Sequence, residues 1–78
     1  MKALIDNYRN GNLADAKRQA RGYNELRLVS GLREHGYGID AAMAIAAYLK
    51  GYGSFQAACD AEHAEKQLNA PAGRTAQG

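Results

Sequence analysis

Residues 41–49 read AAMAIAAYL, and this stretch decides the fold. It contains no charged side chain, and the hydroxyl of Tyr48 is its only polar side-chain group. Alanine, leucine and methionine are strong helix formers, and a helix that is apolar nearly all round has no face suited to water. The stretch therefore predicts a central helix with the rest of the chain packed around it.

Two similar hexapeptides flank this helix, HGYGID at 35–40 and KGYGSF at 50–55, and RGYNEL at 21–26 is a shorter echo. In each, a basic residue ends one helix, where the helix dipole favours a cation. A glycine then takes positive φ, and a polar residue soon afterwards caps the next helix. We interpret the repeat as a signal that ends one helix and begins the next, rather than as a binding motif. It predicts positive φ at Gly22, Gly36 and Gly51 and N-caps at Asn24, Asp40 and Ser54.

The remaining sequence also favours helix, because helix-forming residues dominate and no alternating run predicts a strand. We expect helices over residues 2–9, 13–21, 25–35, 41–49 and 55–68, with boundaries accurate to a few residues. The prediction is an all-α compact bundle of about five short helices, with a single helical domain over 1–69. The tail at 70–78 lacks periodicity and is expected to be disordered.

Composition narrows the class of protein. The 78 residues suffice for one domain, and the single cysteine excludes an intramolecular disulfide. No apolar run approaches the length of a membrane span, and MKALIDNYRN carries charge too early for a signal peptide. We therefore expect a cytoplasmic protein. Much of the apolar content is alanine, which buries little area, so we expect a monomer or a weak homodimer.

Charge is unevenly distributed along the chain. Residues 12–33 hold five basic and two acidic residues, and residues 55–68 hold three acidic and one basic. Arginine and tyrosine are enriched among residues that dominate binding energy. We therefore expect a partner-binding surface at Lys17, Arg18, Arg21, Tyr23 and Arg27. A partner that itself binds nucleic acid would be basic and would favour an alternative surface at Asp60, Glu62 and Glu65.

Reactive side chains lie close together only in ACDAEHAEK at 58–66, where Cys59 and His63 are four residues apart. On a helix such a pair could be a nucleophile and its base, or two metal ligands. Zinc requires three or four ligands, however, and the chain has one other histidine and no glycine-rich phosphate loop. We expect no catalytic residues, no metal and no cofactor, and hence no enzyme.

The stretches YRNGNLADAKRQAR (8–21), YLKG (48–51) and FQAACDAE (55–62) resemble small helical proteins of bacteriophages and other mobile elements. Proteins of this kind are often inhibitors of host systems, and anti-CRISPR proteins are the best-known group. The resemblance implies a non-enzymatic inhibitor that acts in the bacterial cytoplasm by binding a subunit of a CRISPR interference complex. These proteins share no motif, so the resemblance assigns no residue. The alternative is a small helical nucleic-acid-binding regulator that uses the basic face of residues 17–33.

Overall fold

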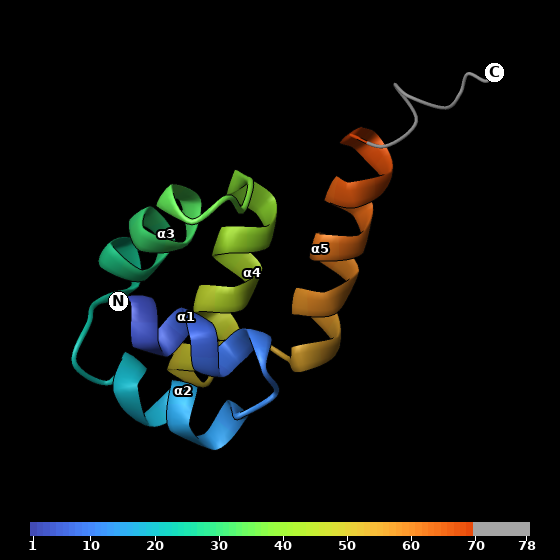
Figure 1. The fold of residues 1–78 in the computed structure, drawn as a ribbon. Helices are drawn as coiled ribbons and strands as arrows, with labels where there is room; N and C mark the ends of the chain where they lie inside the picture. The colour runs from blue at the N-terminus through green and yellow to red at the C-terminus, as the bar shows by residue number, and fades with distance from the viewer. Residues whose placement is uncertain (70–78) are drawn as a thin grey trace, which may run out of the picture.

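The computed structural model describes residues 1–69, which form five helices and no strand (Figure 1). The predicted all-α fold is confirmed, and the predicted tail at 70–78 lies outside the described residues. The boundaries agree with the predicted ones to within two residues. The helices are α1 (Lys2–Arg9), α2 (Leu13–Ala20), α3 (Glu25–Glu34), α4 (Ile39–Lys50) and α5 (Phe55–Asn69).

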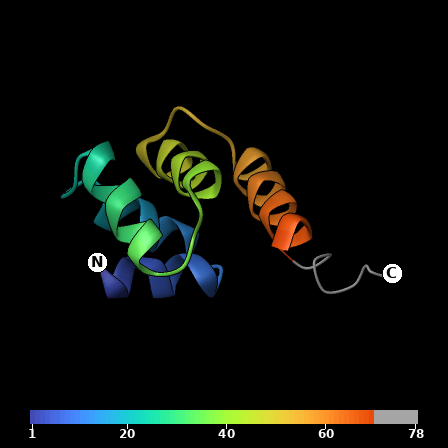
Figure 2. The ribbon, with the colours of Figure 1, turned by 90° about the horizontal axis from the view of Figure 1, so that it is seen from above.

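Helix α4 is central, as predicted. It packs against α2, α3 and α5, and it lies between α3 and α5 in both views of the ribbon (Figures 1 and 2). Helices α1 and α2 pack against each other and cover one end of this layer. Most of the packing joins helices that are neighbours in sequence, α1 with α2, α3 with α4 and α4 with α5, and the contact of α2 with α4 joins the two halves.

Alanine is the most frequent residue type in the buried core. Five of its twelve members are alanines, which allow helix backbones to approach closely but bury little apolar area each. Helix α5 contributes one of the twelve, Ala58, among its described side chains. The buried cluster consists of Leu4, Ile5, Tyr8, Ala16, Ala20, Leu28, Leu32, Ala42, Ile45, Ala46, Leu49 and Ala58.

One side of the central helix remains in contact with solvent. Ile39 and Met43, four residues apart on α4, are 46% and 52% exposed. Sequence periodicity did not predict this, because an apolar helix shows no polar stripe to mark its outer side. Helix α4 is therefore central in the bundle without being enclosed by it.

Two of the three predicted glycine corners have the expected geometry. Gly36 has φ of 104° and Gly51 has φ of 96°. After each of them the amide of the following tyrosine donates to a carbonyl five residues back, which is the Schellman ending. The prediction for Gly22 is wrong. Its amide donates to the carbonyl of Gln19, three residues back, so the chain continues in a tight right-handed turn.

Two of the three predicted N-caps are confirmed and one is wrong. Asn24 accepts from the amide of Arg27 at 2.8 Å, and Ser54 accepts from the amide of Ala57 at 3.0 Å, as expected for capping side chains. The prediction for Asp40 is wrong, because α4 begins at Ile39 and Asp40 is its second residue. The N-cap is Gly38, which has no side chain with which to cap.

Because Gly36 has positive φ and Gly22 does not, substitution by alanine should affect stability differently at the two positions. Gly36→Ala should lower the free energy of unfolding by about 1 kcal/mol, because a Cβ is strained at positive φ. Gly22→Ala is the matched control. Its Cβ would meet only the Gln19 carbonyl at an ordinary 3.6 Å, so stability should be unchanged or slightly raised. Urea unfolding of both variants measures the difference, and equal effects would contradict the assigned backbone conformations.

Candidate functional site

Two of the residues expected to bind a partner lie together at a hollow between α2 and the C-terminal end of α4. Lys17 and Arg21 line this hollow with Leu49, Lys50 and Gly51, and it encloses about 190 Å³. Three cations and no carboxylate line it, so the local potential favours an anion. We call these five residues the basic hollow.

The cations of the basic hollow differ in how freely they can meet a ligand. The Lys17 ammonium lies 4.8 Å from the centre of the Tyr48 ring, a cation–π contact that holds the side chain against α4. Arg21 is exposed and makes no ion pair within residues 1–69. Its guanidinium is therefore the group that an incoming anion would meet most directly.

Lys50 is a member of the basic hollow that sequence reasoning missed as a site residue. Its Nζ donates to the carbonyls of Tyr23 at 2.7 Å and of Ala20 at 3.3 Å. These carbonyls lie at the end of α2 and in the corner that follows it, where a cation satisfies otherwise unpaired acceptors. Lys50 thus fixes the end of α4 against the α2–α3 corner, and its ammonium is partly committed to the fold.

The other three residues predicted to bind a partner lie outside the basic hollow. Arg18 is exposed and forms an ion pair with Asp15 one turn earlier in α2. Arg27 is exposed in the first turn of α3, and neither arginine lines the basic hollow. The hydroxyl of Tyr23 accepts a hydrogen bond from the terminal amino group of Met1 at 3.1 Å. Tyr23 therefore binds the terminal amino group and does not line the basic hollow.

The alternative acidic surface on α5 is largely used within the fold. One oxygen of Glu65 accepts from the amide of Gly38 and the other from the amide of Ala41, both at 2.9 Å. These are the N-cap and third-residue amides of α4, the same two donors that a local capping box satisfies. Glu65 supplies from α5 the cap that α4 lacks in its own sequence.

Glu62 is engaged as well, and Asp60 alone of the three faces solvent freely. The hydroxyl of Tyr8 on α1 donates to Glu62 at 2.7 Å. Burial, and then this hydrogen bond to a carboxylate, raise the pKa of Tyr8 well above its usual value. Asp60 is exposed and accepts from Gln56 one turn earlier at 2.9 Å. The three acidic residues therefore do not form one binding surface.

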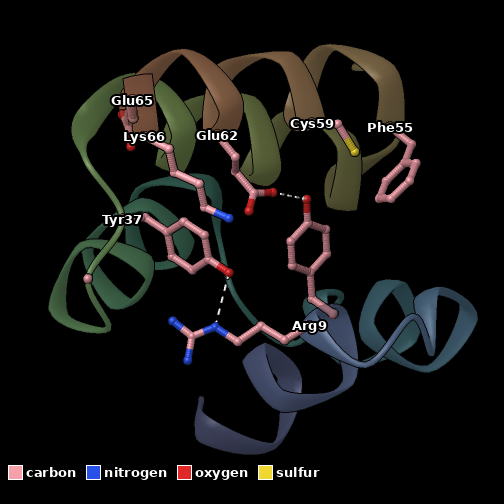
Figure 3. A pocket seen from close by; sticks show the side chains of 9 residues that line it. Arg9, Tyr37, Phe55, Cys59, Glu62, Glu65 and Lys66 are labelled. Carbon is pink, nitrogen blue, oxygen red and sulfur yellow. Dashed lines mark hydrogen bonds between the residues drawn. The ribbon is translucent and has the colours of Figure 1, made fainter. Parts of the chain in front are cut away.

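A larger cleft lies between α1, the α3–α4 loop and α5, and sequence reasoning did not find it (Figure 3). Its volume is about 590 Å³, and its walls combine aromatic rings, a thiol and charges of both signs. The Lys66 side chain extends into it toward Tyr37 (Figure 3). No local pattern could have revealed it, because the lining comes from three separated segments. The lining residues are Tyr8, Arg9, Gly36, Tyr37, Phe55, Cys59, Glu62, Glu65 and Lys66.

One wall of the cleft is fixed by Arg9 at the end of α1. Its Nε donates to the hydroxyl of Tyr37 at 3.1 Å, and its Nη2 donates to the carbonyl of His35 at 2.8 Å. The guanidinium carbon also lies 5.1 Å from the centre of the Tyr37 ring. Arg9 therefore supports the α3–α4 loop, and the opposite wall is held by the edge contact of Phe55 with Tyr8 at 6.2 Å.

The reactive pair on α5 does not converge on this cleft. Cys59 is half-buried and lines it, but His63 is exposed and absent from its lining. The Nε2 atom of His63 is 3.0 Å from the side-chain nitrogen of Gln67. Within residues 1–69, no three histidine, cysteine, aspartate or glutamate side chains are grouped as metal ligands would be.

No family model matches this sequence, and no curated protein or solved structure is significantly similar to it. Among residues 1–69, no helix combines the length and the apolar character needed to cross a membrane. The functional argument therefore depends on the residues and their geometry.

The cap provided by Glu65 predicts a large difference between two acidic residues of the same helix. Glu65→Ala should lower the free energy of unfolding by about 1–2 kcal/mol, because it leaves two amides of α4 without an acceptor. Asp60→Ala, the matched control, should change it by less than about 0.5 kcal/mol, because Asp60 is exposed. Thermal and urea unfolding measure both, and comparable effects would show that Glu65 is not a cap.

Proposed function

We propose that this protein is a non-enzymatic inhibitor of the anti-CRISPR kind, which binds a host protein complex. The observation that carries the proposal is the basic hollow, where Lys17, Arg21 and Lys50 surround one recess without a carboxylate. In this proposal the recess receives an acidic side chain or an acidic loop of the partner protein.

The size and chemistry of the basic hollow support an acidic protein side chain as its ligand. A recess of about 190 Å³ is large enough for a carboxylate group with part of its stem. Arginine presents paired donors that match the two oxygens of a carboxylate, and Arg21 is the exposed cation here. The apolar stem of such a side chain would meet Leu49, which also lines the recess.

The arrangement of cations favours a protein over nucleic acid. Duplex DNA presents about one charge per 1.7 Å of its axis, and proteins that bind it neutralise several phosphates along a track. In this chain Arg18 is paired with Asp15, Lys50 is bonded to two carbonyls, and Arg27 lies outside the hollow. The net charge is only +2. A single localised recess suits one acidic group better than a phosphate track.

The non-enzymatic part of the proposal is supported by the placement of the reactive side chains. Cys59 lines the cleft, whereas His63 lies outside that lining and is exposed. A general base must be within hydrogen-bond reach of the group it activates. The identification of the target as a CRISPR complex rests on the resemblance of the sequence to small helical proteins of mobile elements.

Plasmid interference in bacteria with an active CRISPR system tests this function. Expression of the protein should restore transformation by a targeted plasmid, and Arg21→Glu should weaken that restoration by at least about tenfold through loss of the recess cation. Arg18→Glu is the matched control, with the same charge change three residues earlier, in α2, but outside the recess, and it should retain activity. Failure to restore transformation against every CRISPR type tested would contradict the anti-CRISPR assignment.

Electrophoretic mobility of duplex DNA across a salt series separates the two classes of partner. A protein-directed inhibitor should leave free DNA unshifted at low salt. A shift that is lost steeply as salt rises, and that Arg21→Glu removes, would favour the nucleic-acid-binding alternative.

A further inference from the structure

The cleft between α1, the α3–α4 loop and α5 takes no part in the proposed function, and its lining is ordered along α5 (Figure 3). Four of its residues are spaced four, three and four positions apart, which places them on one face of that helix: Phe55, Cys59, Glu62 and Lys66. An aromatic ring therefore lies at one end of this row and an ammonium group at the other. None of the four residues lines the basic hollow.

The Phe55 end of the cleft presents an aromatic surface to solvent. Phe55 is 42% exposed, although it is a large apolar residue. Its ring centre lies 5.4 Å from that of Tyr48 and 6.2 Å from that of Tyr8, so two further rings hold it in place. A fixed ring in the wall of a cleft offers a surface on which an apolar or aromatic group of a ligand can pack.

The two carboxylates of the cleft are already engaged within the fold. Glu65 accepts from two amides of α4, one at each oxygen, and the dipole of that helix offsets its charge. Glu62 accepts from the hydroxyl of Tyr8. A cationic ligand would therefore compete with three donors of the protein itself.

The two cations of the cleft retain donors for a ligand. The Lys66 side chain extends into the cleft, and its ammonium forms no ion pair within residues 1–69 (Figure 3). Arg9 uses Nε and Nη2 to bind Tyr37 and the carbonyl of His35, and its Nη1 has no partner in this part of the chain. Because the donors left over are cationic, the group that would satisfy them best is an anion.

We propose that this cleft binds an elongated organic anion, with its aromatic part packed on Phe55 and its carboxylate, sulfonate or phosphate group at Lys66. Eleven residues separate these two, a rise of about 16 Å along a helix, and the Lys66 side chain spans part of it. A single small ring would reach only one of them, so the ligand has an apolar body of more than one ring. The cleft volume of about 590 Å³ lies within the range of roughly 300–1,000 Å³ that is usual for small-molecule sites.

This inference is independent of the proposed function, because the cleft and the basic hollow share no lining residue. The two recesses also differ in chemistry. The basic hollow has cations and one leucine, whereas the cleft combines cations with aromatic rings. The anion that the cleft selects is therefore one that carries a large apolar group.

Two dyes with the same pair of rings test the proposal. Anilinonaphthalene sulfonate is an elongated aromatic anion, and phenylnaphthylamine is its neutral counterpart without the sulfonate. Fluorescence titration of the folded protein should show saturable binding of the sulfonate dye. Lys66→Gln should weaken that binding by roughly threefold or more, the size expected for one partly exposed ion pair, and should leave binding of the neutral dye unchanged. Circular dichroism should show the same helix content in each variant.

Lys2→Gln is the matched control, because Lys2 is exposed on α1 and does not line the cleft. It should bind both dyes as the wild type does. Cys59 then reports where the dye lies, since its half-buried thiol lines the cleft. Saturating sulfonate dye should slow the alkylation of Cys59 by iodoacetamide several-fold. Iodoacetamide is neutral, so the charge of the dye does not repel it.

Three results would overturn the proposal. The first is the absence of saturable binding of the sulfonate dye, and the second is alkylation of Cys59 that saturating dye does not slow. The third is a loss of binding that does not depend on Lys66. Equal effects of Lys66→Gln and Lys2→Gln would show this, and so would a loss on Arg21→Gln alone, which would place the dye in the basic hollow.

Discussion

The carboxylate of Glu65 at the N-terminus of α4 is the polar contact that joins α5 directly to the central helix. The N-cap of α4 is Gly38, which has no side chain to satisfy the free amides of the first turn. Both Glu65 oxygens accept from that turn, where the helix dipole also favours a negative charge. A Cβ on Gly38 would lie 2.5 Å from a Glu65 oxygen, so the glycine is what lets the carboxylate approach. Gly38 therefore supplies no cap of its own, and its lack of a side chain makes room for the Glu65 carboxylate that caps α4 instead.

The use of α5 carboxylates within the fold affects which surfaces remain for other molecules. Among the described side chains of α5 only Ala58 is fully buried, so apolar burial alone attaches this helix weakly. Glu62 and Glu65 turn inward to provide the missing attachment, and the acidic character of α5 is used mainly within the fold. Within residues 1–69, the basic hollow, with Arg21 exposed, and the groove that exposed Leu26 and Ile39 line lie away from these contacts of α5.

The sequence was sufficient to predict the five helices and the central position of α4, because apolar periodicity, glycine stops and the caps at Asn24 and Ser54 are local signals. It was insufficient wherever a distant residue replaces a local one. Asp40 had the right side chain for a cap, but Glu65 performs that role from 25 residues further along the chain. Lys50 was expected to complement its own helix end, yet it bonds to carbonyls of the α2–α3 corner. Such contacts have no spacing that a sequence pattern could reveal.

Amide hydrogen exchange at Gly38 and Ala41 tests most directly whether Glu65 holds α4 and α5 together. Amides at a helix N-terminus normally exchange rapidly, because they have no partner within the helix. The account predicts that both amides are protected, and that they exchange at the rate at which α5 opens, together with the Glu62–Tyr8 contact. Exchange of both amides at the rate of an unstructured peptide, with the rest of α4 still protected, would contradict it.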